Sequence, residues 1–356
     1  MSKIKIISLI AAASMIAAGV SGCGQSASAA NTGNDKTETG KLKIVCSIFP
    51  EYDWVKQIMG DKAENADITY LLANGIDLHN FQPTADDIIK ISDCDLFIHV
   101  VGESDEWADD ALKGAVNKDM KVVDLLSTIG ENAKVEELKE GMQGEDEEHD
   151  HEDEDHDHED EDHEEDGSEH HHHEGDEPEY DEHVWLSVKN AKLICAEIAD
   201  KLCAIDEKNA GTYKANLAAY NEKLDELDKD FAALASGASE KTLVFGDRFP
   251  FRYFVDDYGF DYYAAFVGCS AETEASFETI VFLAQKVDAL GTKTIYTLEN
   301  SSKAIAQTII KSTKTKDQTI ATLNSLQSVS RKQADDGTTY ISLMRENYEV
   351  LKSTIS

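Results

Sequence analysis

Residues 206–237, DEKNAGTYKANLAAYNEKLDELDKDFAALASG, form a sustained amphipathic pattern. Large apolar side chains recur in it at alternating spacings of four and three residues: Tyr213, Leu217, Tyr220, Leu224, Leu227, Phe231 and Leu234. This spacing places them on one side of an α-helix. Asp206 can cap the start of the helix, and Gly237 marks its end. At about 1.5 Å per residue, such a helix is long enough to run past two halves of a molecule.

The sequence on both sides of this helix alternates between short apolar strands and helices. Expected strands include KLKIVCSIF at 41–49 and CDLFIHVV at 94–101 ahead of the helix, and TLVFG at 242–246 and TIYTL at 294–298 after it. Such alternation indicates parallel sheets covered by helices. We therefore predict an α/β protein in which two parallel-sheet lobes are joined by one long rigid helix.

The N-terminal residues have the pattern of an export signal. The basic residues Lys3 and Lys5 precede an apolar run at 6–18, which is too short to span a bilayer. Small residues then lead to Cys23, and Ser-Gly-Cys resembles a bacterial lipobox, in which the thiol is lipidated. The alternative is an ordinary signal peptide with a chance cysteine. We expect a lipid anchor at Cys23 that holds the protein on the bacterial cell membrane, outside the cytoplasm.

A second unusual segment, residues 145–182, contains 24 Asp or Glu and nine His, but no Lys, Arg or aliphatic side chain. It cannot bury enough apolar surface to fold, so we expect it to be disordered. Its imidazoles suit a divalent transition metal better than they suit a solubilising charge run or a purification tag. The whole chain has a formal net charge of -38 and no basic block, which argues against nucleic acid as a partner.

These patterns divide the chain into six segments. We expect a lipoprotein signal peptide at 1–22, a flexible tether at 23–40, an N-terminal α/β lobe at 41–130, a disordered His/Asp/Glu-rich loop at 131–182, linker helices at 183–237 and a C-terminal α/β lobe at 238–356.

Two histidines outside the acidic segment stand where a ligand could bind. His79 follows Asp77 in a loop after an expected strand, and the carboxyl ends of strands are where open α/β sheets place ligands. His183 follows an acidic pair just before an expected helix. Taken alone, a loop histidine is more often a surface or structural residue than a ligand, so the residues by themselves leave both interpretations open.

A resemblance to a known family is carried by two motifs, GIDLHNFQPTADDIIKISDCDLFI at 75–98 and DEHVWLS at 181–187. With the long helix that follows, they resemble the solute-binding lipoproteins of bacterial zinc and manganese ABC importers. The resemblance covers essentially the whole chain after residue 40, including the His-rich insert. It implies a metal cleft between the lobes, in which His79 and His183 match the first two metal-ligand histidines of the family.

The C-terminal lobe departs from the pattern of that family. Where the family places a third His, or a Glu in manganese binders, this sequence has Arg248 with Asp247 beside it. Arg has no free lone pair with which to bind a metal. Asn324 stands where the family has an Asp, and Glu299 matches a Glu near the cleft. The site is therefore either completed by Asp247 and a helper such as Glu299 or open to water, and Asp247 could equally be a helix cap.

The resemblance implies a binding protein that performs no chemistry on its cargo. The resemblance gives it His79 and His183 as metal ligands and an ABC permease of the cell membrane as partner. We expect Asp247 and Glu299 to complete the ligand set, although the family does not normally use the matching Glu as a ligand. Imidazole and carboxylate ligands accommodate both Zn²⁺ and Mn²⁺, but intrinsic affinity and the His-rich segment favour Zn²⁺. We expect a monomer.

Two other functions remain possible from the residues alone. A zinc-dependent hydrolase can use two histidines, a carboxylate and an open water position, but the chain has no HExxH or GxSxG motif. A metal-linked surface adhesin, using the acidic segment in cell adhesion, is compatible with metal binding.

The cysteines other than Cys23 show no metal or disulfide spacing. Their number is odd and no CxxC pattern occurs, which argues against a zinc ribbon and against a complete disulfide framework. We expect most of them to be small core residues, the five being Cys46, Cys94, Cys195, Cys203 and Cys269.

Overall fold

The structure, a computed structural model, describes residues 40–144, 179–270 and 274–355. The expected signal peptide, the lipid-anchor residue Cys23, nearly all of the tether and the acidic segment from 145 to 178 lie outside the described residues. Among the helices that are described, none combines the length and the apolar character needed to cross a membrane.

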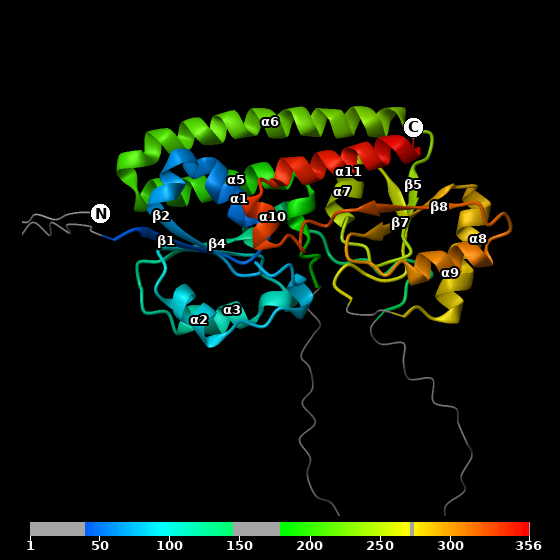
Figure 1. The fold of residues 1–356 in the computed structure, drawn as a ribbon, viewed down its shortest axis with the longest axis horizontal. Coiled ribbons are helices and arrows are strands. Elements are labelled where there is room, and N and C mark those ends of the chain that lie inside the picture. Colours follow the sequence, from blue (N-terminus) through cyan, green and yellow to red (C-terminus); the bar gives the residue numbers. More distant parts are fainter. Residues whose placement is uncertain (1–39, 145–178, 271–273, 356) are drawn as a thin grey trace, which may run out of the picture. The chain divides into compact units, whose positions relative to one another are not determined.

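The N-terminal lobe is built on one parallel sheet with strand order β2-β1-β3-β4. Its strands are β1 (Leu42–Cys46), β2 (Ala66–Tyr70), β3 (Leu96–His99) and β4 (Lys121–Asp124). Its helices are α1 (Phe49–Met59), α2 (Ala85–Ser92), α3 (Trp107–Lys113) and α4 (Leu125–Ile129). Figure 1 shows α2 and α3 on one side of the sheet and α1 on the other. All four residues of β3 are buried, as a central strand covered on both faces requires.

The C-terminal lobe contains two parallel strand pairs, β5 (Thr242–Val244) with β6 (Asp261–Tyr263) and β7 (Thr294–Leu298) with β8 (Thr319–Leu323). A parallel bridge between Phe245 and Tyr296 joins the two pairs. The helices of this part are α7 (Arg252–Tyr258), α8 (Phe277–Leu290), α9 (Ala304–Ser312), α10 (Arg331–Asp335) and α11 (Tyr340–Ile355). Helices α8 and α9 pack together over a separate apolar cluster that includes the fully buried Leu283 and Ile295.

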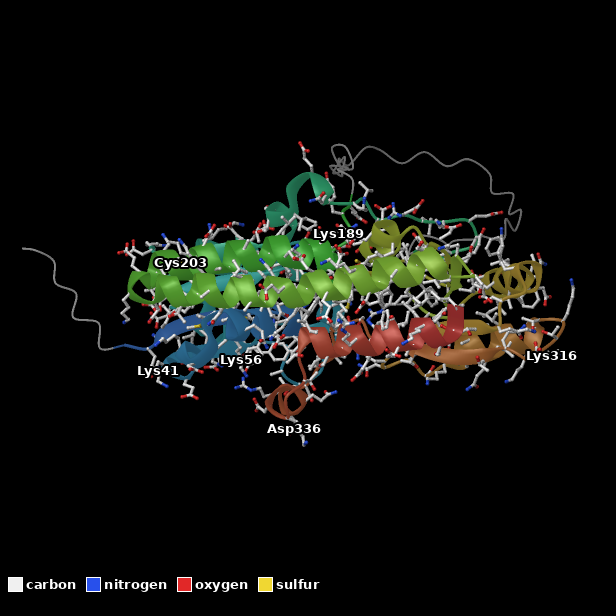
Figure 2. All side chains as sticks on the ribbon, turned by 90° about the horizontal axis from the view of Figure 1, so that it is seen from above. Lys41, Lys56, Lys189, Cys203, Lys316 and Asp336 are labelled. Atoms are coloured by element: carbon white, nitrogen blue, oxygen red, sulfur yellow. The ribbon has the colours of Figure 1, made fainter. Side chains whose placement is uncertain are left out.

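Two linker helices, α5 (Val188–Ile205) and α6 (Ala210–Gly237), connect the lobes. Helix α6 packs on α1 and α5 at one end and on α7 and α11 at the other, so it spans both lobes (Figures 1 and 2). The predicted stripe is its packing face, because Tyr213, Leu224 and Phe231 are fully buried. The α/β fold class with two lobes and one long helix is thus confirmed.

The start of α6 differs slightly from the prediction. Residues 207–209 form a 3₁₀ turn, and the helix proper begins at Ala210. The Asp206 carboxylate accepts hydrogen bonds from the side-chain amide of Asn209, at 2.7 Å, and the hydroxyl of Tyr213, at 2.6 Å, rather than from a helix backbone N–H. Asp206 therefore fixes the turn into the helix instead of capping its first residue.

The predicted start of the disordered loop, residue 131, lies too early in the chain. Residues 131–144 pack on the C-terminal lobe: the Gln143 N–H donates to the Ala265 carbonyl at 2.9 Å, and Met142 is buried. The returning chain pairs with this segment, since the Asp181 N–H donates to the Lys134 carbonyl at 2.8 Å. Residues 131–144 contain Val135, Leu138 and Met142, so the composition that prevents folding does not extend to them.

Candidate metal centre

His79 lies in a 3₁₀ turn (Leu78–Asn80) in the loop after β2. Asp77 caps this turn: its Oδ1 accepts the His79 backbone N–H at 3.2 Å and lies 2.6 Å from Nδ1 of the His79 ring. The side chain of His79 is only 5% exposed, and its Nε2 has no hydrogen-bond partner. Burial lowers the pKa of His79, although the bond to Asp77 acts in the opposite direction.

His183 is held in the same way at the start of the linker helices. It precedes a 3₁₀ turn (Val184–Leu186) that leads into α5. Asp181 Oδ1 accepts the His183 backbone N–H at 2.8 Å and lies 3.0 Å from Nδ1 of the ring. His183 is fully buried, and its Nε2 also lacks a partner.

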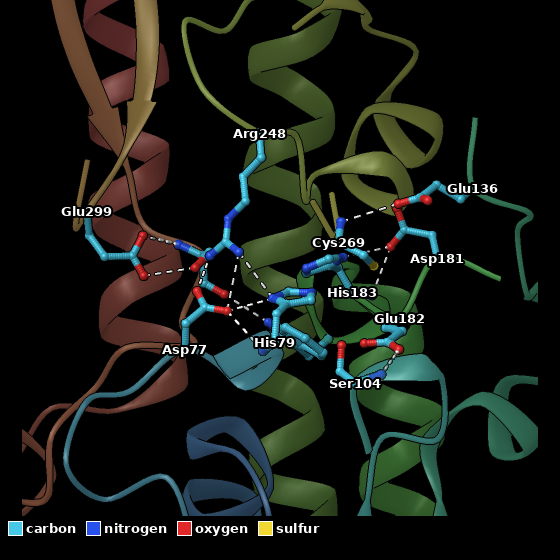
Figure 3. Close-up of polar contacts among 12 residues, drawn as sticks. Asp77, His79, Ser104, Glu136, Asp181, Glu182, His183, Arg248, Cys269 and Glu299 are labelled. Carbon is cyan, nitrogen blue, oxygen red and sulfur yellow. Dashed lines mark hydrogen bonds and ion pairs between the residues drawn. The ribbon is translucent and has the colours of Figure 1, made fainter. Parts of the chain in front are cut away.

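The two histidines are therefore held by their aspartates in the same way. A carboxylate that accepts the Nδ1 proton fixes the tautomer in which Nε2 carries a free lone pair, and metal-binding histidines in proteins are held in this way. The centroids of the two rings are 5.3 Å apart, so one ion can reach both (Figure 3). Two buried nitrogens without partners would cost free energy in a protein that left them unused.

Cys269 completes a cluster with the two histidines. Its sulfur and one nitrogen of each ring all lie within 4.8 Å of one another, and within the described ranges this is the one group of three His, Cys, Asp or Glu donors that could hold a metal. Cys269 lies in the loop after β6, where its N–H donates to Glu136 at 3.3 Å. Burial, together with the carboxylates of Glu182 and Asp181, raises the pKa of its thiol.

Sequence reasoning missed Cys269 as a candidate ligand. It was expected to be a core residue, as Cys46, Cys94 and Cys195 are, but it is only partly buried. The one available signal was its position, two residues beyond the apolar run 262–267 in the lobe that lacked a convincing ligand.

A buried carboxylate, Glu182, lies on another side of the cluster (Figure 3). Only 1% of the residue is exposed. Oε1 accepts the Ser104 N–H at 2.8 Å, whereas Oε2 has no partner. Burial raises the pKa of Glu182. Glu182 is adjacent to His183 in the chain, but nothing in the sequence indicates that its side chain is buried.

Arg248 faces the cluster from the C-terminal lobe and pairs with Asp77 (Figure 3). Its Nη1 lies 3.3 Å from Asp77 Oδ1 and 3.1 Å from His79 Nδ1. Burial alone would raise the pKa of Asp77, but the bond with His79 and the charge of Arg248 hold it well below its usual value. Asp77 therefore stays ionised and anchors both neighbours. A pocket of about 380 Å³ opens beside this pair.

The other two expected ligands lie outside the three-residue cluster. Asp247 Oδ1 accepts the Arg248 N–H at 3.0 Å, and Oδ2 accepts the Leu298 N–H at 3.1 Å, so this carboxylate ties the loop after β5 to β7. Glu299 accepts the N–H and the hydroxyl of Ser325, both at 2.8 Å. The structure brings together His79 and His183, but it gives Asp247 and Glu299 backbone-fixing roles.

Asn324, the residue at the expected Asp position, also fixes backbone. Its Oδ1 accepts the N–H of Leu326 at 2.7 Å, and Leu326 has a positive φ of 64°. An Asx-type turn of this kind explains an Asn or Asp at this place without any metal.

A two-lobe α/β fold with a buried donor cluster at the ends of its strands is that of a solute-binding protein. The sequence model described as "Zinc-uptake complex component A periplasmic" matches residues 44–354. The chain belongs to this family.

Individual relatives agree with this assignment. The zinc-binding protein AdcA of Streptococcus pyogenes serotype M3 is 32% identical over 321 residues, which cover 88% of this chain and 56% of that protein. The high-affinity zinc uptake system protein ZnuA of Bacillus subtilis is 28% identical over 336 residues, covering 94% and 93%. The chain thus spans little more than half the length of the streptococcal relatives it matches.

A solved structure supports the fold. The Zn(II)-bound ZnuA-like domain of Streptococcus pneumoniae AdcA has a TM-score of 0.65 and 29% identity, covering 89% of this chain and 99% of that one.

Proposed function

We propose that this protein captures Zn²⁺ outside the cytoplasm and delivers it to the permease of an ABC importer. The observation that carries the proposal is the pair of buried histidines, each with Nδ1 held by an aspartate and Nε2 without a partner. Such an arrangement is preorganised for a transition metal. The family's description as a zinc-uptake component points in the same direction.

The ligand types favour zinc over manganese as cargo. Buried imidazoles bind Zn²⁺ well, whereas Mn²⁺ prefers carboxylate and water oxygens. The carboxylates predicted to supply those oxygens, Asp247 and Glu299, accept hydrogen bonds from backbone and hydroxyl groups instead. Mn²⁺ is therefore the less favoured cargo, and His79 with His183 form the core of the proposed site.

The proposed mechanism is capture and release without chemical change of the ion. His79 belongs to the N-terminal lobe and His183 to the entry of the linker helices, while Arg248 and Cys269 approach from the C-terminal lobe. Because α6 packs on both lobes, a small movement of lobes or loops, rather than a wide hinge opening, would release the ion to a permease. This role requires no catalytic base, which separates it from the zinc-dependent hydrolase.

The cellular setting follows from the N-terminal pattern and from the family. A lipid on Cys23 would anchor a monomer at the outer face of the cell membrane, within reach of the permease. Replacing Cys23 by Ala should release the protein into the medium and abolish labelling with a radioactive fatty acid. Retained membrane association and labelling would contradict the anchor.

Calorimetric zinc titration of the full chain tests the function. We expect one tight site, and we expect His79→Ala with His183→Ala to weaken it by more than the roughly 10–100-fold that changes outside the ligand shell cause. His99→Gln is a matched control, because His99 is also buried, in β3, and contacts Asp105 rather than this cluster. Unchanged tight affinity in the double variant would refute the site.

A further inference from the structure

The proposed zinc site needs a donor from the C-terminal lobe. Zinc in proteins binds three or four protein ligands, and the two imidazoles supply only two. The guanidinium of Arg248 cannot bind a metal, and both oxygens of Asp247 accept backbone N–H groups. Glu299, the other predicted carboxylate, accepts the N–H and the hydroxyl of Ser325. We therefore look for the third ligand among the residues that the sequence pattern does not indicate.

Cys269 meets the geometric requirement. Its sulfur lies within 4.8 Å of a nitrogen of each histidine ring, and the Nε2 atoms of both rings are buried and have no hydrogen-bond partner. Gly268 lets its loop approach the His183 ring closely: a Cβ at Gly268 would lie 3.0 Å from Cε1 and 3.1 Å from Nδ1 of that ring. The loop is thus built to bring Cys269 against the two histidines.

The charges around Cys269 favour a bound cation. Glu136 accepts its N–H, and Asp181 and Glu182 are close enough to act electrostatically on its sulfur. Glu182 keeps one buried oxygen, Oε2, without a partner. A divalent cation here would offset the negative charge of the carboxylates around the cluster.

We propose that Cys269 is the third metal ligand, so that the ion is held by two imidazoles and one thiolate and bridges the two lobes. This inference rests on the proposed function and specifies its ligand set. When the zinc–sulfur bond forms, the thiol proton passes to solvent. A soft thiolate donor selects Zn²⁺ and similar ions over Mn²⁺, so Cys269 is also the residue that sets metal preference.

X-ray absorption at the zinc edge, on the reduced full chain loaded with one equivalent of Zn²⁺, tests this ligand set. We expect one sulfur at about 2.3 Å together with nitrogen or oxygen neighbours at about 2.0–2.1 Å. A shell of nitrogen and oxygen alone, on protein that binds zinc tightly, would overturn the role of Cys269 and leave the proposed function standing. Failure of the wild-type chain to bind zinc tightly would overturn both.

Variants provide an independent test. Cys269→Ser should lose the sulfur signal and weaken zinc binding at least tenfold, whereas Cys203→Ser, a partly buried cysteine on α5, should change neither. Cys269→Asp should lower the ratio of the affinity for Zn²⁺ to the affinity for Mn²⁺. Unchanged zinc affinity and metal preference in folded Cys269 variants would refute the proposal.

Discussion

Each of the two histidines is held by one aspartate, two residues before it in the chain, and this contact prepares it for the metal binding that we propose. The Asp-x-His spacing lets one carboxylate oxygen accept both the histidine's backbone N–H and its Nδ1 proton. A rigid pair of this kind costs little ordering entropy when an ion arrives. Asp77 also forms an ion pair with Arg248. Among the described residues, Asp181 forms no ion pair with a Lys or Arg.

The role of Asp181 is testable by removing its charge. Asp181→Asn keeps the shape of the side chain but weakens the hold on the His183 tautomer, so we expect zinc affinity to fall by about 10–100-fold. Asp225→Asn on α6, which breaks an ion pair with Lys192 on α5 and does not touch the histidines, is the control and should leave affinity unchanged. Equal affinities of the two variants in calorimetric titration would show that Asp181 does not orient the ligand.

The sequence predicted the histidine pair but not Cys269, for a physical reason. His79 and His183 each stand in a local motif that can be read within a few residues. Cys269 approaches them through packing between segments that are far apart in the chain. No spacing of cysteines in the sequence predicts this contact. Asp247 was a reasonable candidate by its position in the sequence. Its Oδ2 accepts the N–H of Leu298 in β7, and the sequence alone does not predict this contact.

At the scale of elements, α6 packs on helices of both lobes and so connects them. Phe231, near its C-terminal end, is 1% exposed and contacts the rings of Phe254 and Tyr258 on α7 and Tyr348 on α11. This aromatic contact joins the linker to the C-terminal lobe. The period of the stripe predicted the packing face of α6, because alternating spacings of three and four have no other regular explanation.

Truncating this contact should destabilise the protein. We expect Phe231→Ala to lower the free energy of unfolding by about 3–5 kcal/mol, since it removes a buried ring and leaves a cavity. Lys229→Ala, at an exposed position of the same helix, should change it by less than about 0.5 kcal/mol. Denaturant titration measures both. A small effect at Phe231 would mean that α6 does not bind the C-terminal lobe through this cluster.

At the scale of the whole molecule, we propose that the acidic segment is separable from the proposed tight site. The residues before and after this segment are joined by two backbone hydrogen bonds. The Glu136 N–H donates to the Glu179 carbonyl at 2.9 Å, and the Asp181 N–H donates to the Lys134 carbonyl at 2.8 Å. The backbone around His183 is therefore held by contacts that do not involve residues 145–178. The predicted loop boundary at residue 131 is too early, because residues 131–144 make buried contacts and backbone hydrogen bonds. The prediction for residues 145–178 lies outside the described residues.

Replacing residues 145–178 by a short Gly-Ser linker should leave one tight zinc site with unchanged affinity. The same change should remove the weaker binding of further zinc ions, because it deletes all nine histidines of the acidic segment. Calorimetric titration separates the two classes of site. Loss of the tight site on deletion would mean that the segment itself forms it.

Zinc should also stabilise the folded chain as a whole. An ion that binds only the native state adds about 2.7 kcal/mol to the free energy of unfolding when its free concentration is one hundred times its Kd. The thermal midpoint of unfolding should therefore rise by several degrees with zinc and fall again when a chelator is added. The double variant with His79→Ala and His183→Ala should show no such rise. An equal rise in that variant would place the stabilising ion elsewhere.

The most direct test of the central claim is a crystal structure of the zinc-loaded full chain with anomalous scattering measured at the zinc edge. We predict one strong peak about 2.0–2.1 Å from Nε2 of both His79 and His183. A strong zinc peak elsewhere, with these two nitrogens left without an ion, would contradict the account.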